Sequence, residues 1–273
     1  MKGIANMENN TKQYDEHDLY TFASCGSQDD LNKKIDYLSQ LAEEENWTVD
    51  DTYKNGILRY YVFYTFRQCH IQNRILYSSD KQWCCINTGL LDKHSNDIMM
   101  IFQINQKKSD KNSKEWFLKA FQTKADRDYM EHFDNVPSLA KYTDNIEDYY
   151  FDPDAKIVVN YEHILDDNWD RIYSVVHMDK QVMKALLVGV IESSKIRVQR
   201  NMRLVVPQLY NNKIMYLMPI YIPVNDTETV TMALAIEKTS TGLYRANTIF
   251  TKDDAYRKAR LLMKPESNWL IDD

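Results

Sequence analysis

Strand-like segments in this sequence come in adjacent pairs instead of alternating with helices. Residues 202–210 and 213–221 flank Asn211-Asn212, two residues that tolerate the positive φ angles of a tight hairpin turn. Residues 230–237 and 243–250 flank a second turn, Thr-Ser-Thr-Gly. Neighbouring strands that pair directly make antiparallel sheets. We therefore predict an α+β fold, in which an antiparallel-rich sheet of hairpins packs with several helices.

Helical periodicity and turn residues place the other elements. Apolar residues recur at helical spacing in 29–45 and in 58–69, so both segments are predicted helices. A longer helix over 181–201 is apolar on several sides of its first half, and we expect it at the centre of the core. Asn87-Thr88-Gly89 predicts a turn. Further strands are expected at 74–79, 82–87, 98–104, 116–121 and 157–159, and further helices at 125–133, 162–171 and 252–263.

The composition favours a chain that is folded over nearly its whole length. Hydrophobic residues make up 44% and aromatic residues 12%, whereas the chain has only 6 Gly and 6 Pro; disordered chains show the reverse. Residues 1–18 are polar and are predicted to be a flexible leader. Residues 19–273 are predicted to be a single α+β domain, or two tightly packed lobes meeting near residue 145. No internal repeat is visible in the sequence.

Several classes of protein are excluded by missing features. No apolar run reaches the roughly 18 residues that a bilayer-spanning helix needs, and the N-terminus lacks the apolar core of a secretory signal. We expect a cytoplasmic protein with no membrane partner. The spacing of Cys25, Cys69, Cys84 and Cys85 fits neither a zinc site nor a redox pair, so reduced thiols are predicted. Cys84 and Cys85 lie between Trp83 and Ile86, which favours burial of both. The sequence names no cofactor. It also lacks the phosphate loop and the dinucleotide, hydrolase-elbow and zincin motifs.

A cluster of cations marks the first candidate site. Lys195, Arg197, Arg200 and Arg203 fall within nine residues, where the long helix meets a strand. Arg197 and Arg200 are one helical turn apart and can converge on a phosphate. The alternative is a solvated face, or ion pairs with the acidic segment 143–172. The predicted phosphate or nucleic-acid site comprises Asn87, Lys195, Arg197, Arg200, Asn201, Arg203 and Gln208.

A histidine beside carboxylates marks the second candidate site. On a helix, His163 and Asp166 share a face, and the aspartate can orient the imidazole for acid–base catalysis. His163 and Asp166 are therefore the predicted catalytic residues. The alternative is a histidine that packs or caps near the start of a helix. No third metal ligand is visible, so no metal site is predicted.

Four stretches of the sequence match the pattern of a known family. They are 85–90, 160–163 with Asp166, Asn168 and Arg171, 195–208, and 255–262 with Pro265 and Trp269. In these stretches the chain resembles the family known as domain of unknown function 3825, and the resemblance covers roughly residues 19–270. It implies a bacterial protein whose relatives often lie beside RNA-binding modules of the cold-shock or LOTUS type, and therefore a role in RNA metabolism. It implies no reaction.

Two functions are compatible with these residues, and the sequence does not decide whether the protein is an enzyme. The first is a nucleotide- or RNA-recognising domain, with possible action on phosphoester bonds, because Arg supplies charge, Asn and Gln read base edges, and His transfers protons. The second is a noncatalytic protein–protein interaction domain whose acidic and basic segments bind a protein partner. One pocket holding all of the following residues would favour the first: Asn87, His163, Arg197, Arg200, Asn201 and Gln208.

Overall fold

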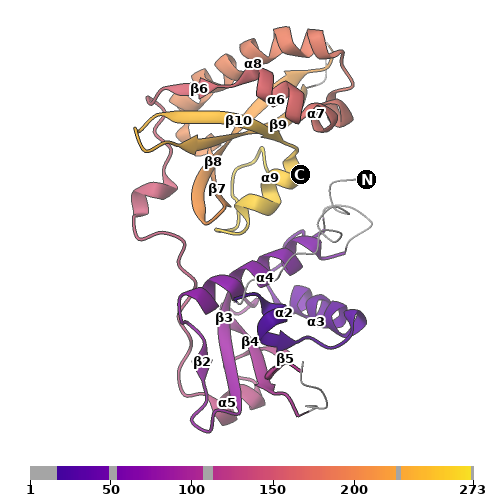
Figure 1. Ribbon diagram of the computed structural model, residues 1–273, viewed down its shortest axis with the longest axis vertical. Helices are drawn as coiled ribbons and strands as arrows, with labels where there is room; N and C mark the ends of the chain where they lie inside the picture. Colours follow the sequence, from indigo (N-terminus) through magenta and orange to yellow (C-terminus); the bar gives the residue numbers. More distant parts are fainter. Residues whose placement is uncertain (1–16, 49–53, 107–112, 226–228, 272–273) are drawn as a thin grey trace. The chain divides into compact units, whose positions relative to one another are not determined.

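The computed structural model describes residues 17–48, 54–106, 113–225 and 229–271, and the chain divides into two compact units (Figure 1). The N-terminal unit extends to Lys141 and the C-terminal unit begins at Tyr142. Most of the predicted leader, residues 1–16, lies outside the described residues. Each unit has its own five-stranded, mostly antiparallel sheet with helices, which confirms the α+β fold.

The N-terminal unit has a sheet in the order β1-β5-β4-β3-β2, with β1 parallel to β5 and all other pairs antiparallel. The helices predicted for 29–45 and 58–69 are confirmed as α3 and α4. Ser27 and Asp30 form a reciprocal capping box at the start of α3. In order, the elements are α2 (Leu19–Phe22), β1 (Ala23–Ser24), α3 (Gln28–Leu41), α4 (Gly56–Ile71), β2 (Leu76–Tyr77), β3 (Trp83–Leu91), β4 (Asp97–Ile104), β5 (Trp116–Thr123) and α5 (Arg127–His132).

The predicted turn at Asn87-Thr88-Gly89 is wrong, because β3 continues through it to Leu91. The register with β4 shifts after Asn87, and Gly89 has a φ of +74°, so these residues form a β-bulge. Thr88 Oγ1 donates to the carbonyl of Ile98 at 2.6 Å, which holds the bulge against the neighbouring strand. Residues typical of a turn thus make a bulge where a partner strand continues beside them.

The C-terminal unit has a sheet in the order β6-β10-β9-β8-β7, with β6 parallel to β10 and all other pairs antiparallel. Asn211 and Asn212 have φ angles of 50° and 59°, which confirms the tight β7–β8 hairpin. The elements are β6 (Ile157–Val159), α6 (Tyr161–Asp167), α7 (Trp169–Val176), α8 (Lys180–Arg200), β7 (Val206–Tyr210), β8 (Lys213–Pro223), β9 (Thr229–Lys238), β10 (Tyr244–Phe250) and α9 (Lys252–Ala259), with short 3-10 helices at Ile146–Tyr149 and Met202–Leu204.

Three elements in this unit differ from the prediction by more than two residues. The helix expected over 162–171 is two helices, because Asn168 turns its side-chain amide to the carbonyl of Ile164 and ends α6. The strand expected from residue 202 begins at Val206, since Asn201 caps a 3-10 turn before it. The last helix ends at Ala259 instead of Met263.

The sheet of the C-terminal unit packs against helices on both faces. One face contacts α6, α7 and α8, and the buried side of α8 includes Met183, Leu187 and Ile191. Val182 is 53% exposed, so α8 is buried along one side only, contrary to the prediction that it lies at the centre of the core. The other face packs against α9 through small residues of β9 and α9: Ala233, Ala235, Ala255 and Ala259.

The two units share one topology. In each, the first strand is followed by helices and then by a four-stranded antiparallel meander, and the first strand pairs in parallel with the last. The registers agree too: Ala23 lies beside Trp116 at the start of β5, and Ile157 lies beside Tyr244 at the start of β10. The sequence shows no repeat, whereas the backbone repeats its strand order.

The last strand of each unit carries a bulge at the same place. The pairing of β5 with β4 skips Lys119, and the pairing of β10 with β9 skips Asn247. Each skipped residue lies four positions before the threonine of a Thr-Lys-x-Asp sequence, at 123–126 and 251–254. An end helix, α5 or α9, follows in each unit and contributes to a hydrophobic cluster on its sheet.

Candidate functional site

The lysines of α8 are all engaged by carboxylates. Lys180 pairs with Asp166 at 3.0 Å and Lys184 pairs with Glu162 at 3.3 Å, so α6 lies along the first half of α8. Lys195 pairs with Glu192 of its own helix at 2.6 Å. Ion pairs with segment 143–172, weighed as an alternative for the cation cluster, thus form at the lysines near the start of the helix.

The arginines at the C-terminal end of α8 differ from its lysines. In the part of the chain that the structure describes, none of Arg197, Arg200 and Arg203 contacts a carboxylate, and all three are exposed. Arg197 lies over the ring of Tyr221, 4.7 Å from its centroid, and Arg200 donates to the carbonyl of Ile196 at 2.8 Å. The helix dipole favours cations at this end. The positive charge of this surface is therefore available to a ligand.

Asn201 and Gln208 separate from each other in the fold. Asn201 stays with the arginines, since its Oδ1 accepts from the backbone N–H of Arg203 at 3.2 Å. Gln208 is 1% exposed, and strand alternation puts it with Val206 on the face of the sheet that packs against α9. Since α8 covers the opposite face, Gln208 does not join the arginine cluster.

The histidine motif forms a different pair from the one expected. His163 Nδ1 lies 3.2 Å from Asp167 Oδ2, and Asp166 pairs instead with Lys180. Both His163 and Asp167 are exposed, and the backbone N–H of His163 donates to the Asn160 side chain at the helix start. The imidazole thus has a carboxylate partner, and that partner is Asp167.

The helix that carries His163 forms its ion pairs with the first half of α8, whereas the arginines lie at the end of α8. The helix α6 contacts α8 at Lys180 and Lys184, whereas Arg200 ends that helix. A helix rises about 1.5 Å per residue, so about 24 Å separates Lys184 from Arg200. The structure therefore does not bring the predicted catalytic residue to the predicted phosphate site.

Asn87 belongs to the N-terminal unit and has a structural environment. It is 2% exposed, its Nδ2 donates to Asp97 Oδ1 at 3.1 Å, and its Oδ1 accepts from the N–H of Gly89 at 2.9 Å. Those contacts hold the bulge of β3. Of the residues expected in one pocket, Arg197, Arg200 and Asn201 lie close together, at the C-terminal end of α8.

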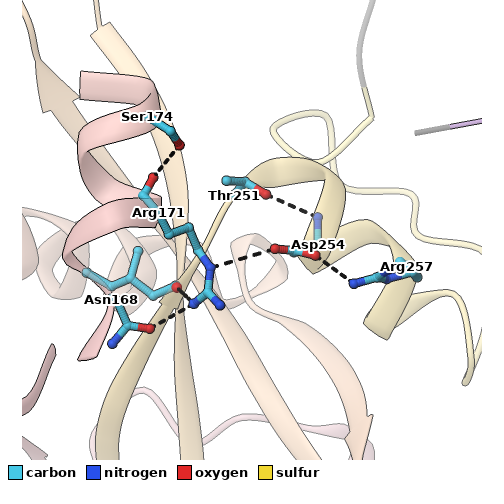
Figure 2. A network of polar contacts seen from close by, with 7 residues as sticks. Asn168, Arg171, Ser174, Thr251, Asp254 and Arg257 are labelled. Atoms are coloured by element: carbon cyan, nitrogen blue, oxygen red, sulfur yellow. Dashed lines mark hydrogen bonds and ion pairs between the residues drawn. The ribbon is translucent and has the colours of Figure 1, made fainter. Parts of the chain in front are cut away.

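A polar network that the sequence did not predict connects α7, β10 and α9 (Figure 2). Arg171 Nη1 donates to Asn168 Oδ1 at 2.7 Å and to the carbonyl of Ile249 at 2.6 Å. Its Nε lies 3.7 Å from Asp254 Oδ2, while Arg257 Nη2 donates to Asp254 Oδ1 at 2.7 Å. A single carboxylate thus contacts two arginines.

Lys258 adds a further cation to this network. Its Nζ lies 4.9 Å from the ring centroid of Phe250 and 5.2 Å from that of Tyr210. Burial lowers the pKa of Lys258, and the nearby charge of Arg257 lowers it further. The sequence showed Arg257 and Lys258 only as neighbours on a helix, because the groups around them come from segments far away in the chain.

The thiols are not suited to nucleophilic chemistry. All four cysteines are free and buried, which confirms the burial predicted for Cys84 and Cys85. Burial raises the pKa of Cys25 to about 11 and that of Cys69 to about 12, and it raises the pKa values of Cys84 and Cys85 as well. A thiol needs a lowered pKa to act as a nucleophile at neutral pH. These side chains therefore contribute packing.

Two other kinds of feature are absent from the described residues. No group of three or more His, Cys, Asp or Glu side chains that could hold a metal ion occurs among them. No helix within them is long and apolar enough to cross a membrane.

Comparison with known proteins gives one match. The model of the family described as Domain of unknown function (DUF3825) matches residues 38–269. No curated protein matches the chain. No solved structure matches it.

Proposed function

The chain belongs to the DUF3825 family, and from that starting point and the geometry of α8 we propose that it recognises the phosphates of RNA or of a nucleotide. The proposed site is the C-terminal end of α8 and the turn after it, with Arg197, Arg200, Asn201 and Arg203. Family membership names no ligand, so the proposal depends on these side chains.

The contrast between lysines and arginines on α8 carries the proposal. Its three lysines are all ion-paired, whereas the described carboxylates leave Arg197, Arg200 and Arg203 without an ion pair. A guanidinium presents a planar fork of donors that matches two phosphate oxygens. Unlike the ion-paired lysines, these arginines are ready to bind an anion without first breaking an internal salt bridge.

Tyr221 supports a ligand that also carries a base. The guanidinium of Arg197 lies on its ring, and both the ring and the guanidinium are flat groups on which a nucleobase can stack. The net charge of the chain is −6, so broad, nonspecific attraction to nucleic acid is not expected. Binding is proposed to be confined to this end of α8.

The first prediction tests the phosphate role with Arg200→Ala. Log affinity for a labelled single-stranded RNA should fall linearly with log salt, at a slope of roughly 0.7 per phosphate contacted, and losing one contact should reduce the slope by about that amount. Fluorescence anisotropy at several salt concentrations measures both quantities. Lys184→Ala is the matched control, because Lys184 lies on the same helix but pairs with Glu162.

Two results would contradict the proposal. One is an affinity that responds neither to salt nor to Arg200→Ala. The other is an equal loss in Lys184→Ala, which would mean that any positive charge on α8 serves. Asn201→Ala should weaken binding without changing the slope, since an amide carries no charge.

A second candidate function, noncatalytic binding of a protein partner, is favoured by apolar side chains exposed on the same helix. Val182 and Ile196 are 53% and 51% exposed, and Val188 is exposed as well. The salt titration separates the two candidates, because an apolar docking face gives no salt-dependent affinity for RNA. Val182→Ser should leave RNA affinity unchanged, whereas it should reduce co-purification of a protein partner that occupies this face.

A further inference from the structure

We infer that Arg171 and Lys258 form a second anion site, which takes a phosphate dianion held between α7 and α9. Its ligand is inorganic phosphate, or the terminal phosphate of a nucleotide or oligonucleotide. This site shares no residue with the arginines of α8, so it goes beyond the proposed function and does not depend on it.

The charges of Arg171 and Lys258 are incompletely compensated. Asp254 is the carboxylate that contacts Arg171, and it is shared with Arg257. Lys258 Nζ makes neither a hydrogen bond nor an ion pair with the described residues, and it lies over the rings of Phe250 and Tyr210. A half-buried ammonium in this position has unused donors, and such a group is costly to bury without partners.

Both cations lie against the same aromatic ring, which limits the distance between them. The Arg171 guanidinium lies 5.2 Å from the centroid of the Phe250 ring and Lys258 Nζ lies 4.9 Å from the same centroid, so the two groups are at most about 10 Å apart. Arg171 uses Nη1 and Nε for protein contacts, and its Nη2 makes no hydrogen bond to a described residue. Nη2 and Nζ are therefore the donors proposed for the phosphate oxygens.

The N-terminal unit shows that the shared topology does not require these cations. There, the carboxylate of Asp126 accepts from the N–H of Thr123 at 2.7 Å and from its hydroxyl at 3.0 Å. The arginine of that end helix, Arg127, pairs with Glu131 at 2.6 Å. In the C-terminal unit the corresponding aspartate, Asp254, contacts two arginines instead, although the same Thr-Lys-x-Asp sequence leads into the helix. The shared topology therefore does not by itself bring cations together, and the cluster of Arg171, Arg257 and Lys258 belongs to the C-terminal unit.

The electrostatics of Lys258 favour an anionic ligand. Burial lowers the pKa of its amine, and the charges of Arg257 and Arg171 add to the effect, while Asp254 opposes it. A dianion bound beside the amine would offset the lowering. Without the anion, the amine loses its proton more readily than an exposed lysine and becomes a nucleophile.

Pyridoxal 5′-phosphate is a probe with the chemistry that this site should select. Its phosphate should be bound by Arg171 Nη2 while its aldehyde condenses with the neutral amine of Lys258, releasing water and forming an imine that borohydride reduces to a stable secondary amine. Peptide mass spectrometry of the whole chain then locates the label. We expect Lys258 to be labelled at least about tenfold faster than Lys180, a matched control that also lies over an aromatic ring, that of Trp169, but pairs with Asp166.

Protection distinguishes the two phosphate sources. Inorganic phosphate or a 5′-phosphorylated oligonucleotide should slow labelling of Lys258, and the more effective of the two identifies the source. Equal labelling of Lys258 and Lys180, or labelling that neither phosphate slows, would overturn the inference. Equal protection by a 5′-hydroxyl oligonucleotide would also overturn it, because internal diesters would then be enough.

Variants separate this site from the α8 arginines and from simple structural roles. Arg171→Gln should reduce labelling of Lys258 about tenfold, and Arg200→Ala should leave labelling and protection unchanged. If Arg171→Gln does not fold, thermal unfolding decides: millimolar phosphate should raise the Tm of the wild type above that in chloride of equal ionic strength, and Lys258→Met should abolish the difference. A shift that persists in Lys258→Met would contradict the inference.

Discussion

Single residues of one type take different roles in this protein according to what lies beside them. Lys184 and Lys258 are both helical lysines, yet one forms an ion pair with Glu162 and the other lies over two aromatic rings. Asn201 caps a turn at the surface, while Asn87 is buried and holds a bulge. Residue type alone therefore does not identify a functional side chain.

The arrangement of the α8 arginines could be read from the sequence because it depends on local spacing. Arg197 and Arg200 lie one turn apart on a single helix. The network around Asp254 could not be predicted in that way, since Arg171 lies 83 positions earlier in the chain. Only the fold of the sheet brings α7 and α9 to the same end of β10.

A residue-scale prediction concerns His163. Because α6 forms its ion pairs with Lys180 and Lys184, in the first half of α8, and the arginines lie at the other end, His163→Ala should leave RNA affinity unchanged. If the protein cleaves RNA or a nucleotide phosphoester through this side chain, turnover should fall by about 10²–10⁴-fold, the usual contribution of general acid–base catalysis. Parallel binding and turnover assays on a panel of RNA, capped RNA and dinucleotide substrates measure both effects.

The carboxylate variants sharpen this test. His163 Nδ1 contacts Asp167, so Asp167→Asn should lower turnover and Asp166→Asn should not. Full turnover by a well-folded His163→Ala protein would remove the catalytic role. The reverse order of the two aspartate variants would restore the pairing that the sequence suggested.

At the scale of elements, regular segments were predictable and interruptions were not. The periodic helices α3 and α4 and the hairpins of the C-terminal unit were confirmed, because each depends on a local pattern. The break at Asn168 comes from a side chain that bonds to the backbone of its own helix, at Ile164, which apolar periodicity does not report. The bulge at Gly89 depends on the neighbouring strand β4. A sequence such as Asn87-Thr88-Gly89 predicts that the backbone bends. Whether the bend becomes a hairpin turn or a bulge depends on whether the neighbouring strand continues beside it.

An element-scale prediction follows for Gly89→Ala. The φ of +74° costs a residue with a side chain about 1–2 kcal/mol. A Cβ would also lie 2.7 Å from the Tyr61 hydroxyl, which donates to the carbonyl of Thr88 at 2.9 Å. The free energy of unfolding from urea denaturation should therefore fall by more than the φ cost alone.

Two comparisons isolate the causes. Gly189→Ala, on the exposed side of α8 with nothing within 4 Å of the added carbon, should instead stabilise the protein by about 0.5–1 kcal/mol. Adding Tyr61→Phe to Gly89→Ala should recover the part of the loss caused by the clash. A Gly89→Ala protein as stable as the wild type would show that the bulge relaxes freely.

At the scale of the whole molecule, the chain repeats a topology without repeating a sequence. A position in the sheet requires an apolar side chain on the correct face, and many residue types meet this requirement. For example, Leu217 beside Ala235 in the C-terminal unit corresponds to Cys85 beside Ile101 in the N-terminal unit. Register and strand order are therefore retained while residue identity differs. The Thr-Lys-x-Asp sequence that both units share is too short to reveal this repeat without the strand pairing.

A whole-molecule prediction concerns the fragment of residues 142–273. This unit has a complete sheet with hydrophobic clusters on both faces, so the fragment should fold alone and unfold in one cooperative transition. Far-UV circular dichroism and amide chemical-shift dispersion test this. Residues 142–250 are the control: without α9, the face with Val206 and Leu217 is uncovered, and cooperative folding should be lost. A disordered 142–273 fragment would favour a single domain.

The parallel pairing of the first strand with the last also sets an order of events during synthesis. Ile157 cannot pair until Tyr244 has been synthesised, 87 residues later, and Ala23 cannot pair until Trp116 has been synthesised, 93 residues later. At translation rates of about 5–20 residues per second, each first strand leaves the ribosome roughly 4–19 s before its partner exists. The meander can pair as it emerges, so one edge of each sheet closes last. Until then chaperones can bind the unpaired first strand. If the ribosome stalls before Trp116 or Tyr244, that strand stays unpaired.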